Sequence, residues 1–591
     1  MPILKTKNYR DFEIDGQSVP YSCLDRVLPN DEVVSGGKNS KIWTFVKRAD
    51  HPPLVGILDC LNKVRYGFTA KNVPIYLFTP MNPAYPPFRV GSTIDPSQNY
   101  LIVIKHESWD LGSAMPRGVL VESIGPVGDY EAESKALYWL YSPWTAYSKK
   151  MESIENPSID IEDRIDMRDG NWQTFNVDPA GCQDIDDVFS YKRSIQSSDF
   201  EEILCDSDYD TDSSCEEALY YSIGYAQRQK FKEERRQLRE KEQVFDCAIT
   251  IADVAELIVE GGPIDMIARK AGQSLYQDGR KPRHMLPTVF AEEYGSLAPN
   301  TDRIGITMFF TACLEKKTIS EVWFRETVIR NQKSYTYDDV VKTAHAPILQ
   351  TLCQMLTPTA DATDSHNWIA ALMIFYNKEF AKQIYGYKAG ILRSHSAPAI
   401  NRIKELEAIN PELAFLAFSA ANYVSATDTD TSHYGLDTNL YTHATSPLRR
   451  YADIQNQRVM KKIIRYLPED EARKDLLPLL NTASKAAKNH DRDYTWLTAL
   501  FSTDEKEITA QIVELKQKDQ TVRVNAWVPL WKRMIKLSFA SLGGEGEGEV
   551  VVISKDEKST HTLKKGQPIR VAFSYDPAKP RWKERMIFKL L

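Results

Sequence analysis

Short runs of alternating hydrophobic and polar residues occur toward both ends of the chain. Between residues 41 and 145 there are five such runs: KIWTFV, LVGIL, IYLFTP, YLIVIKHESW and GVLVESIG. Pro, Gly and Asn separate these runs, and the pattern predicts a small five-stranded barrel over 41–145. Residues 1–40 are polar with little periodicity, and we assign them to an N-terminal extension.

Four aromatic residues of the predicted barrel have two interpretations. Tyr66, Phe68, Tyr76 and Phe78 alternate as the residues of a strand do. They could form the core of the barrel, or some of them could form a surface on which nucleic-acid bases stack.

The middle of the chain, 146–503, has a mixed pattern. Residues 171–192 read as strand, acidic loop and strand, and a strand pattern resumes at VFDCAITIADV. Amphipathic helices are predicted over 366–387 and 401–425, and a long helix is predicted after Pro447. This is the pattern of a mixed α/β domain.

Residues 195–243 interrupt this domain. Their first part, 195–217, holds nine acidic residues and no Lys or Arg, and the part from 226 is charged on all sides. A segment without an apolar stripe has no face to bury. We interpret it as an inserted surface excursion, either a solvated insert or an arm that binds a protein partner.

Short strands return over 504–591 and predict a second small barrel. The whole chain has a net charge of −7, but residues 510–591 hold 16 Lys and Arg against 9 Asp and Glu. Charge is therefore segregated, and a basic module at the C-terminal end can bind a polyanion despite the acidic total.

The composition narrows the class of protein. The chain of 591 residues has eight cysteines, none of them in a CxxC pair, which excludes a disulfide scaffold and a cysteine-rich zinc site. No apolar run is long enough to cross a membrane, and the first residues lack the apolar core of a secretory signal. We expect an intracellular monomer without membrane contact, in the cytoplasm, with an organelle left open.

The strongest local chemistry lies in DPAGCQDIDD, which holds four carboxylates within ten residues: Asp178, Asp184, Asp186 and Asp187. Such acids repel one another unless cations compensate them. Hard oxygen ligands of this kind suit Mg²⁺, with Mn²⁺ as a substitute. The apolar flanks of the segment place the acids against a core, although a solvated acidic turn is the alternative.

A second segment, YTHATSPLRRYADIQNQR at 441–458, suggests an anion site. Ser446 is a good N-cap and Pro447 suits the first helical position, so we predict a helix from Leu448. Arg449 and Arg450 would then lie in its first turn, where cations oppose the helix dipole. We therefore assign both to binding a phosphate, with an ion pair to Asp453 as the structural alternative.

Metal-binding acids and phosphate-binding arginines together indicate phosphodiester hydrolysis or phosphoryl transfer. At these two segments the chain resembles the RNase II/RNase R exoribonuclease family, including its eukaryotic exosome-type members. Other resembling pieces follow in the family's order: RIDMR, ITIADV, SLYQDGRKPRHMLP, GSLAPNTDR, SYTYDDV, RSHSAP and HYGL. In ITIADV, Thr250 stands where the family usually has His.

The resemblance implies a multidomain fold: a mixed α/β catalytic RNB domain flanked by OB-type barrels, cold-shock-like before it and of the ribosomal RNA-binding type after it. Only one such barrel is predicted before the catalytic domain, where the family usually has two. The family clamps the terminal base between two aromatic side chains. Tyr276 resembles the first, and Tyr385 or Tyr387 are candidates for the second.

The implied activity is processive 3′-to-5′ hydrolysis of single-stranded RNA to nucleoside 5′-monophosphates. The four aspartates would hold Mg²⁺, with Asp186 needed most for chemistry, and Arg449 supported by Arg450 would stabilise the transition state. The residues expected to bind RNA are Tyr276, Tyr337, Arg393, His395, Thr445 and Ser446. Two alternatives are a catalytically inactive family member that works as an RNA-binding repressor or scaffold, and a nuclease directed at DNA.

Overall fold

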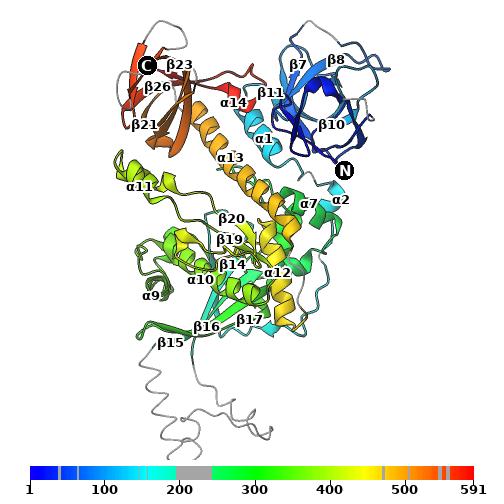
Figure 1. The fold of residues 1–591 in the computed structure, drawn as a ribbon. Helices are drawn as coiled ribbons and strands as arrows, with labels where there is room; N and C mark the ends of the chain where they lie inside the picture. The colour runs from blue at the N-terminus through cyan, green and yellow to red at the C-terminus, as the bar shows by residue number, and fades with distance from the viewer. Residues whose placement is uncertain are drawn as a thin grey trace, which may run out of the picture.

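The protein consists of a β-rich N-terminal part, a mixed α/β part and a C-terminal β-sheet (Figure 1). The computed structural model describes residues 1–36, 42–62, 66–144, 147–155, 157–194, 243–468, 473–502, 506–518, 520–543, 549–553 and 560–591. All of the predicted insertion except Gln243 lies outside these residues, so both interpretations of it stay predictions. In Figure 1 the two β-rich parts lie above the mixed part.

The described residues up to Lys47 form six short strands, of which the sequence pattern predicted only the last, β6. Two three-stranded sheets, β1-β2-β3 and β4-β6-β5, enclose a small core that includes Leu4, Phe12 and Val33. The strands are β1 (Leu4–Thr6), β2 (Phe12–Ile14), β3 (Gln17–Val19), β4 (Leu24–Asp25), β5 (Glu32–Ser35) and β6 (Trp43–Lys47). Strands of two to five residues are too short to show a period, which explains the wrong prediction.

The closed barrel begins at Leu54 and not at residue 41. The first predicted run, KIWTFV, contains β6, and this strand pairs with β4 and β5. The fifth strand of the barrel is instead β9, a short strand that lies between prolines. The barrel has the order β10-β11-β9-β8-β7, with β7 (Leu54–Asp59), β8 (Ile75–Pro80), β9 (Phe88–Gly91), β10 (Tyr100–Ser108) and β11 (Arg117–Pro126).

The structure separates the four aromatic residues of this region. Tyr76 and Phe78 are 3% and 0% exposed in the barrel core, whereas Phe68 is 62% exposed. Tyr66 is half-buried in the loop before β8. The core interpretation therefore holds for the pair on β8, and Phe68 stays a candidate for base stacking.

The mixed part is built on a seven-stranded sheet of order β12-β17-β16-β15-β14-β13-β18. Its strands are β12 (Ile165–Asp166), β13 (Gln173–Val177), β14 (Asp187–Arg193), β15 (Val244–Ala252), β16 (Asp302–Cys313), β17 (Thr318–Arg330) and β18 (Lys333–Tyr335). β14 and β15 pair in antiparallel register out to Arg193 and Phe245. The residues that flank the predicted insertion therefore lie on neighbouring strands.

Helices cover both faces of this sheet, since its strands carry apolar residues on both sides. One face packs on α9 (Ala346–Leu356) and α10 (Ser365–Gly386). The other packs on α6 (Val254–Leu257), α7 (Pro263–Ala271) and the first turns of α12 (Tyr451–Ile464). A small sheet of β19 (Ile391–Ser394) and β20 (Asn422–Ser425) lies beside them.

The helix predicted over 366–387 is confirmed by α10. The one predicted over 401–425 is much shorter, because α11 (Ile400–Glu407) ends before Pro411 and a 3-10 helix, η3 (Pro411–Ala417), follows. The remaining helical segments are α1 (Tyr130–Tyr141), α2 (Lys149–Glu152), α8 (Tyr337–Val340), α13 (Leu477–Ser502), α14 (Trp582–Arg585), η1 (Tyr21–Cys23), η2 (Val289–Tyr294), η4 (Tyr434–Leu436), η5 (Lys474–Leu476) and η6 (Pro529–Trp531).

The C-terminal part is an antiparallel sheet of seven strands, order β25-β24-β23-β22-β21-β26-β27. The strands are β21 (Glu507–Lys518), β22 (Thr521–Val528), β23 (Arg533–Gly543), β24 (Glu549–Ile553), β25 (Thr560–Lys564), β26 (Pro568–Tyr575) and β27 (Met586–Leu590). Sequence reasoning missed β25. The long helix α13 runs from the mixed part up to this sheet and packs on α1 (Figure 1).

Within the described residues, no helix combines the length and the apolar character that crossing a bilayer requires.

Candidate active site

The four predicted metal ligands lie on the loop between β13 and β14. Asp178 directly follows β13, and Asp187 is the first residue of β14. Asp184 and Asp186 precede the strand on irregular backbone, which Gly181, with a φ of 82°, helps to turn.

Asp186 is the buried member of the group, 5% exposed. One of its carboxylate oxygens accepts from the backbone N–H of Leu448 at 2.9 Å, and the other from Nε of Arg449 at 3.3 Å. Burial raises the pKa of Asp186 to about 7, against the lowering effect of the Arg449 charge. The acid segment and the arginine segment therefore meet at this one side chain.

The other acids have separate partners. Asp178 accepts from the Asn176 amide at 2.8 Å, and Asp184 accepts from the Tyr276 hydroxyl at 2.5 Å. Burial, and then the charges of Asp178 and Asp186, raise the pKa of Asp187 well above its usual value. Burial likewise raises the pKa of Asp178.

The arginine helix starts later than predicted. Residues 447–449 form a turn, and α12 begins at Tyr451 with Arg450 at its N-cap position. The reason is Asp453, whose carboxylate accepts from the backbone N–H of Ser446 at 2.8 Å and folds the preceding residues back. Both arginines thus precede the helix.

The two arginines have different surroundings. Arg449 is exposed by 46% and contacts Asp186. Arg450 pairs with Asp453 at 2.8 Å, which is the structural alternative that the sequence left open. Its guanidinium also donates to the hydroxyl of Thr445 at 3.3 Å. A supporting role for Arg450 in catalysis stays a prediction, with the ion pair as its observed contact.

The two tyrosines expected to bind RNA lie beside the acids. Tyr276 is 42% exposed, and its hydroxyl donates a hydrogen bond to Asp184. Tyr337 stacks on His366 with ring centroids 3.9 Å apart. Burial, and then the charges of Asp178 and Asp187, raise the pKa of Tyr337 to about 12.

Arg393 lies on β19, and His395 directly follows this strand. Arg393 is 5% exposed, its guanidinium lies 4.4 Å from the centroid of the Tyr423 ring, and its Nη1 has no hydrogen-bond partner. His395 accepts from the backbone N–H of Gly435 at 3.2 Å. Among the described residues, neither hydrogen-bonds nor pairs with any of the four acids, so RNA binding by Arg393 and His395 stays a prediction.

One candidate for the second clamping aromatic is wrong. Tyr387 donates to the carbonyl of Leu467 at 2.8 Å, just beyond the C-terminal end of α12. Arg449 precedes the other end of this helix, whose 14 residues span roughly 20 Å. Tyr385 lies in the last turn of α10 and is 44% exposed.

Sequence reasoning missed two residues that contact the acids. Asn176 donates to Asp178, and as residue i−2 on the same strand it shares a face with the acid, which was the available signal. Nδ1 of His284 lies 3.9 Å from a carboxylate oxygen of Asp184. Its only sequence signal was its place in the same segment as Tyr276.

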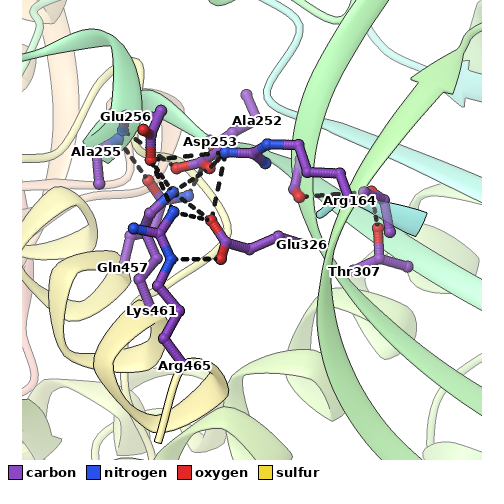
Figure 2. A network of polar contacts seen from close by, with 12 residues as sticks. Arg164, Ala252, Asp253, Ala255, Glu256, Thr307, Glu326, Gln457, Lys461 and Arg465 are labelled. Carbon is purple, nitrogen blue, oxygen red and sulfur yellow. Dashed lines mark hydrogen bonds and ion pairs between the residues drawn. The ribbon is translucent and has the colours of Figure 1, made fainter. Parts of the chain in front are cut away.

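A second acidic group in the described chain tests what a metal site requires. Asp253, Glu256 and Glu326 have oxygens within 4.8 Å of one another. Figure 2 shows that cations already surround them: Arg164 lies 2.9 Å from Asp253, and Lys461 and Arg465 lie 2.6 and 2.8 Å from Glu326.

These cations neutralise the three acids. Burial alone would raise the pKa of Glu326, but Arg465 and Lys461 hold it at about 2. With three acids facing three cations, the group is an ion-pair network and not a vacant metal site.

The four aspartates have an excess of negative charge, since in the described part of the chain Arg449 is the one Lys or Arg side chain that pairs with them. Their oxygens are not drawn together as closely as those of the triad, because Leu448 and Tyr276 hold two of the carboxylates apart. Mg²⁺ usually takes only one or two carboxylates and fills its shell with water and phosphate oxygens. The donor chemistry and the excess of negative charge therefore fit a divalent cation.

Comparison with known proteins identifies two matching family models. The family model described as RNB domain matches residues 164–350 and 348–466, and the model described as Dis3-like cold-shock domain 2 (CSD2) matches residues 75–142. Among curated proteins, the mouse exosome complex exonuclease RRP44 is 22% identical over 473 residues, which are 65% of this chain and 44% of the relative. DIS3-like exonuclease 2 of Schizosaccharomyces pombe is 23% identical over 545 residues, 72% of this chain and 53% of the relative.

The chain therefore spans about half the length of these relatives. Two solved structures share its fold. Mycoplasma genitalium RNase R, in complex with ribose-methylated single-stranded RNA, has a TM-score of 0.66 at 16% identity, with both chains covered completely. Yeast Ssd1, described as a pseudonuclease, has a TM-score of 0.58 at 15% identity, covering 98% of this chain and 82% of Ssd1.

Proposed function

Because the chain belongs to the RNB domain family, we propose that it is a processive 3′-to-5′ exoribonuclease that hydrolyses single-stranded RNA to nucleoside 5′-monophosphates with Mg²⁺. The observation that carries the proposal is the contact of Asp186 with Leu448 and Arg449. This contact brings the four aspartates, which have an excess of negative charge, together with the exposed guanidinium of Arg449, which can contact a phosphate.

Each side chain has a part in the proposed reaction. Mg²⁺ held by Asp178, Asp184, Asp186 and Asp187 would supply an activated water and neutralise charge on the scissile phosphate. Arg449 keeps its guanidinium exposed beside Asp186 and donates to the phosphate oxygens, where charge develops in the transition state.

Aromatic side chains position the end of the RNA in this proposal. The exposed ring of Tyr276, fixed at its hydroxyl by Asp184, stacks on the terminal base, and Tyr337 contacts the last nucleotide. Stacking accepts every base, which suits complete degradation. The 2′-hydroxyl of RNA provides discrimination against DNA.

The rival candidate is an RNA-binding protein without nuclease activity, because the fold is also that of the pseudonuclease Ssd1. The presence of all four acids and of Arg449 favours the enzyme.

The test is an assay with end-labelled single-stranded RNA or DNA, in Mg²⁺ or in EDTA. We expect mononucleotides from RNA in Mg²⁺ alone. Asp186→Asn should reduce hydrolysis to background while RNA affinity stays within several-fold, because affinity is spread over many contacts. The amide keeps an acceptor for Leu448, so folding is preserved.

Asp15→Asn is the matched control, since Asp15 is exposed in the turn between β2 and β3. Tight RNA binding without hydrolysis by the unmodified protein would favour the rival. Equal cleavage of DNA would favour a DNA-directed nuclease.

A further inference from the structure

A cavity of about 580 Å³ lies at the junction of the barrel, α1 and the segment 276–284. The same segment borders the four aspartates on its other side. Tyr276 at its start bonds to Asp184, and His284 at its end lines the cavity while lying 3.9 Å from Asp184. A single layer of side chains therefore separates the cavity from the candidate active site.

The cavity offers cations that have no acidic partner. Arg280 and Lys135, also in its lining, pair with Glu131 and Glu122. Among the described residues, no ion pair is found for Lys281, which is exposed, or for Arg283.

Arg283 is fixed in place without being neutralised. Its Nε donates to the carbonyl of Ser142 at 2.8 Å and its guanidinium covers the Trp139 ring at 4.1 Å. Its Nη2 is buried without a hydrogen-bond partner. Burial lowers the pKa of Arg283 to about 10, although the nearby charge of Glu122, with which it forms no direct ion pair, acts in the opposite direction. A rigid donor of this kind suits a phosphate or carboxylate.

Further unpartnered polar atoms border the cavity. Gln277 is 4% exposed, and its Oε1 has no hydrogen-bond partner. Nδ1 of His284 also has no hydrogen-bond partner. The other ring nitrogen of this histidine contacts Glu292. Buried polar groups without partners are rare in proteins and commonly mark a place where a ligand or water binds.

A second cavity lies beside the segment, and its lining has acidic side chains but no cation. It measures about 460 Å³, is lined by Tyr276 and α13, and carries the acids Asp278, Asp491 and Glu507 without any cation. The lining of the first cavity also includes the acids Asp129 and Glu152, but Lys281 and Arg283 give a phosphate monoester two cations to pair with, and the lining of the second cavity gives it none.

We propose that the cavity bordered by Lys281, Arg283 and His284 binds nucleoside 5′-monophosphate, the product of the reaction proposed above, on its way from the active site. This inference rests on the proposed function. Phosphate oxygens pair with the two free cations, and apolar lining residues such as Ile124 and Leu286 take the base without selecting it. The volume is that of a small-ligand site.

The test is binding of AMP and of adenosine to EDTA-treated protein, so that no metal at the aspartates contributes. We expect AMP to bind at least tenfold more tightly than adenosine, because the phosphate supplies the charged contacts. Lys281→Ala and Arg283→Gln should each weaken AMP binding about tenfold. Arg283→Lys should retain part of it.

Lys382→Ala is the matched control, an exposed lysine of α10 paired with Glu379. The Lys281 and Arg283 variants should weaken AMP binding in the Arg449→Ala background as well, which separates the cavity from the active site. Equal affinity for AMP and adenosine, or equal AMP binding by the Lys281 and Lys382 variants, would overturn the inference. AMP binding at the cavity without RNA hydrolysis would support the ligand class while refuting the proposed nuclease.

Discussion

Arg449 and Arg450 are adjacent in the chain but differ in their contacts. Arg449 is exposed beside Asp186, whereas Arg450 is tied to Asp453, which also fixes the Ser446 backbone. We predict that Arg449→Ala lowers the hydrolysis rate about 10²–10³-fold with little loss of stability. Arg449→Lys should not restore the rate fully, because lysine lacks the planar fork.

Arg450→Ala serves as the comparison for this prediction. It leaves the buried Asp453 without its cation, so it should lower the melting temperature as well as the rate. Single-turnover kinetics and thermal melts of both variants check this. A stable Arg450 variant with the rate defect of Arg449→Ala would assign both residues to chemistry.

Lys461, like Arg164, pairs with all three acids of the ion-pair network of Figure 2. It contacts Asp253, Glu256 and Glu326 and is 7% exposed. We predict that Lys461→Met destabilises the protein by about 3 kcal/mol, because buried acids lose a cation. Lys382→Met on α10, which breaks an exposed pair, should cost about 0–1 kcal/mol. Urea denaturation of both variants measures the difference, and equal midpoints would contradict the prediction.

At the residue scale, sequence reasoning found the acids and Arg449 because their residue types reveal their chemistry. It could not find His284, whose contact with Asp184 joins positions 100 apart. Nor could it decide between the two interpretations of Arg450, since an ion pair to Asp453 and a phosphate contact use the same guanidinium. Only the fold brings such partners together.

Among the elements, long periodic segments were predictable and short ones were not. The helix over 366–387 and the neighbouring strands β14 and β15 agree with the sequence pattern. β9 and β25 have four and five residues, too few to establish a period. The start of α12 was misplaced because Ser446 and Pro447 look like a helix start, and the tertiary bond to Asp453 overrides that local signal.

The β14–β15 pair also defines where the predicted insertion joins the fold. The last paired residues are Arg193 and Phe245, and the backbone N–H of Ser194 donates to the Val244 carbonyl at 3.0 Å. We predict that a short Gly/Ser turn in place of 195–243 leaves hydrolysis of unstructured RNA nearly unchanged. Stability should change by less than about 1 kcal/mol, since loop-closure entropy depends weakly on length.

The corresponding measurements are a nuclease assay and a thermal melt of the shortened chain. Loss of activity with an unchanged melt would show that the insertion takes part in the reaction. Loss of function only in cells would instead support an arm that binds a partner.

For the whole molecule, the C-terminal sheet is fastened to the rest by a buried ion pair. Arg585, at the end of α14, pairs with Glu133 of α1, and both are 0% exposed. We predict that Arg585→Met destabilises the protein by about 3–5 kcal/mol, because Glu133 is left buried without a cation. Adding Glu133→Leu should restore most of the loss, since an apolar pair can replace a buried ion pair. Thermal melts of the single and double variants form the test, and a double variant as unstable as the single one would contradict it.

The junction of α1 and α13 should also respond to pH. His490 of α13 is buried with its ring stacked on Tyr138 of α1, and burial lowers its pKa to about 4. The unfolded chain takes up this proton near pH 6.5, so between pH 6.5 and 4 it binds more protons than the folded chain. We therefore predict that stability is full above pH 6.5 and falls as the pH is lowered toward 4. His490→Gln should reduce the slope of melting temperature against pH, and an unchanged slope would exclude this histidine as a contributor.

The hydrogen bond between Leu448 and Asp186 joins positions 262 residues apart. A ribosome therefore synthesises the aspartates long before the residues that complete the site. A growing chain that exposes only the acids has no arginine beside them, and its proposed active site is incomplete. Under the proposed function, a chain still on the ribosome would lack a complete active site until α12 has emerged and packed, so the order of synthesis would delay nuclease activity.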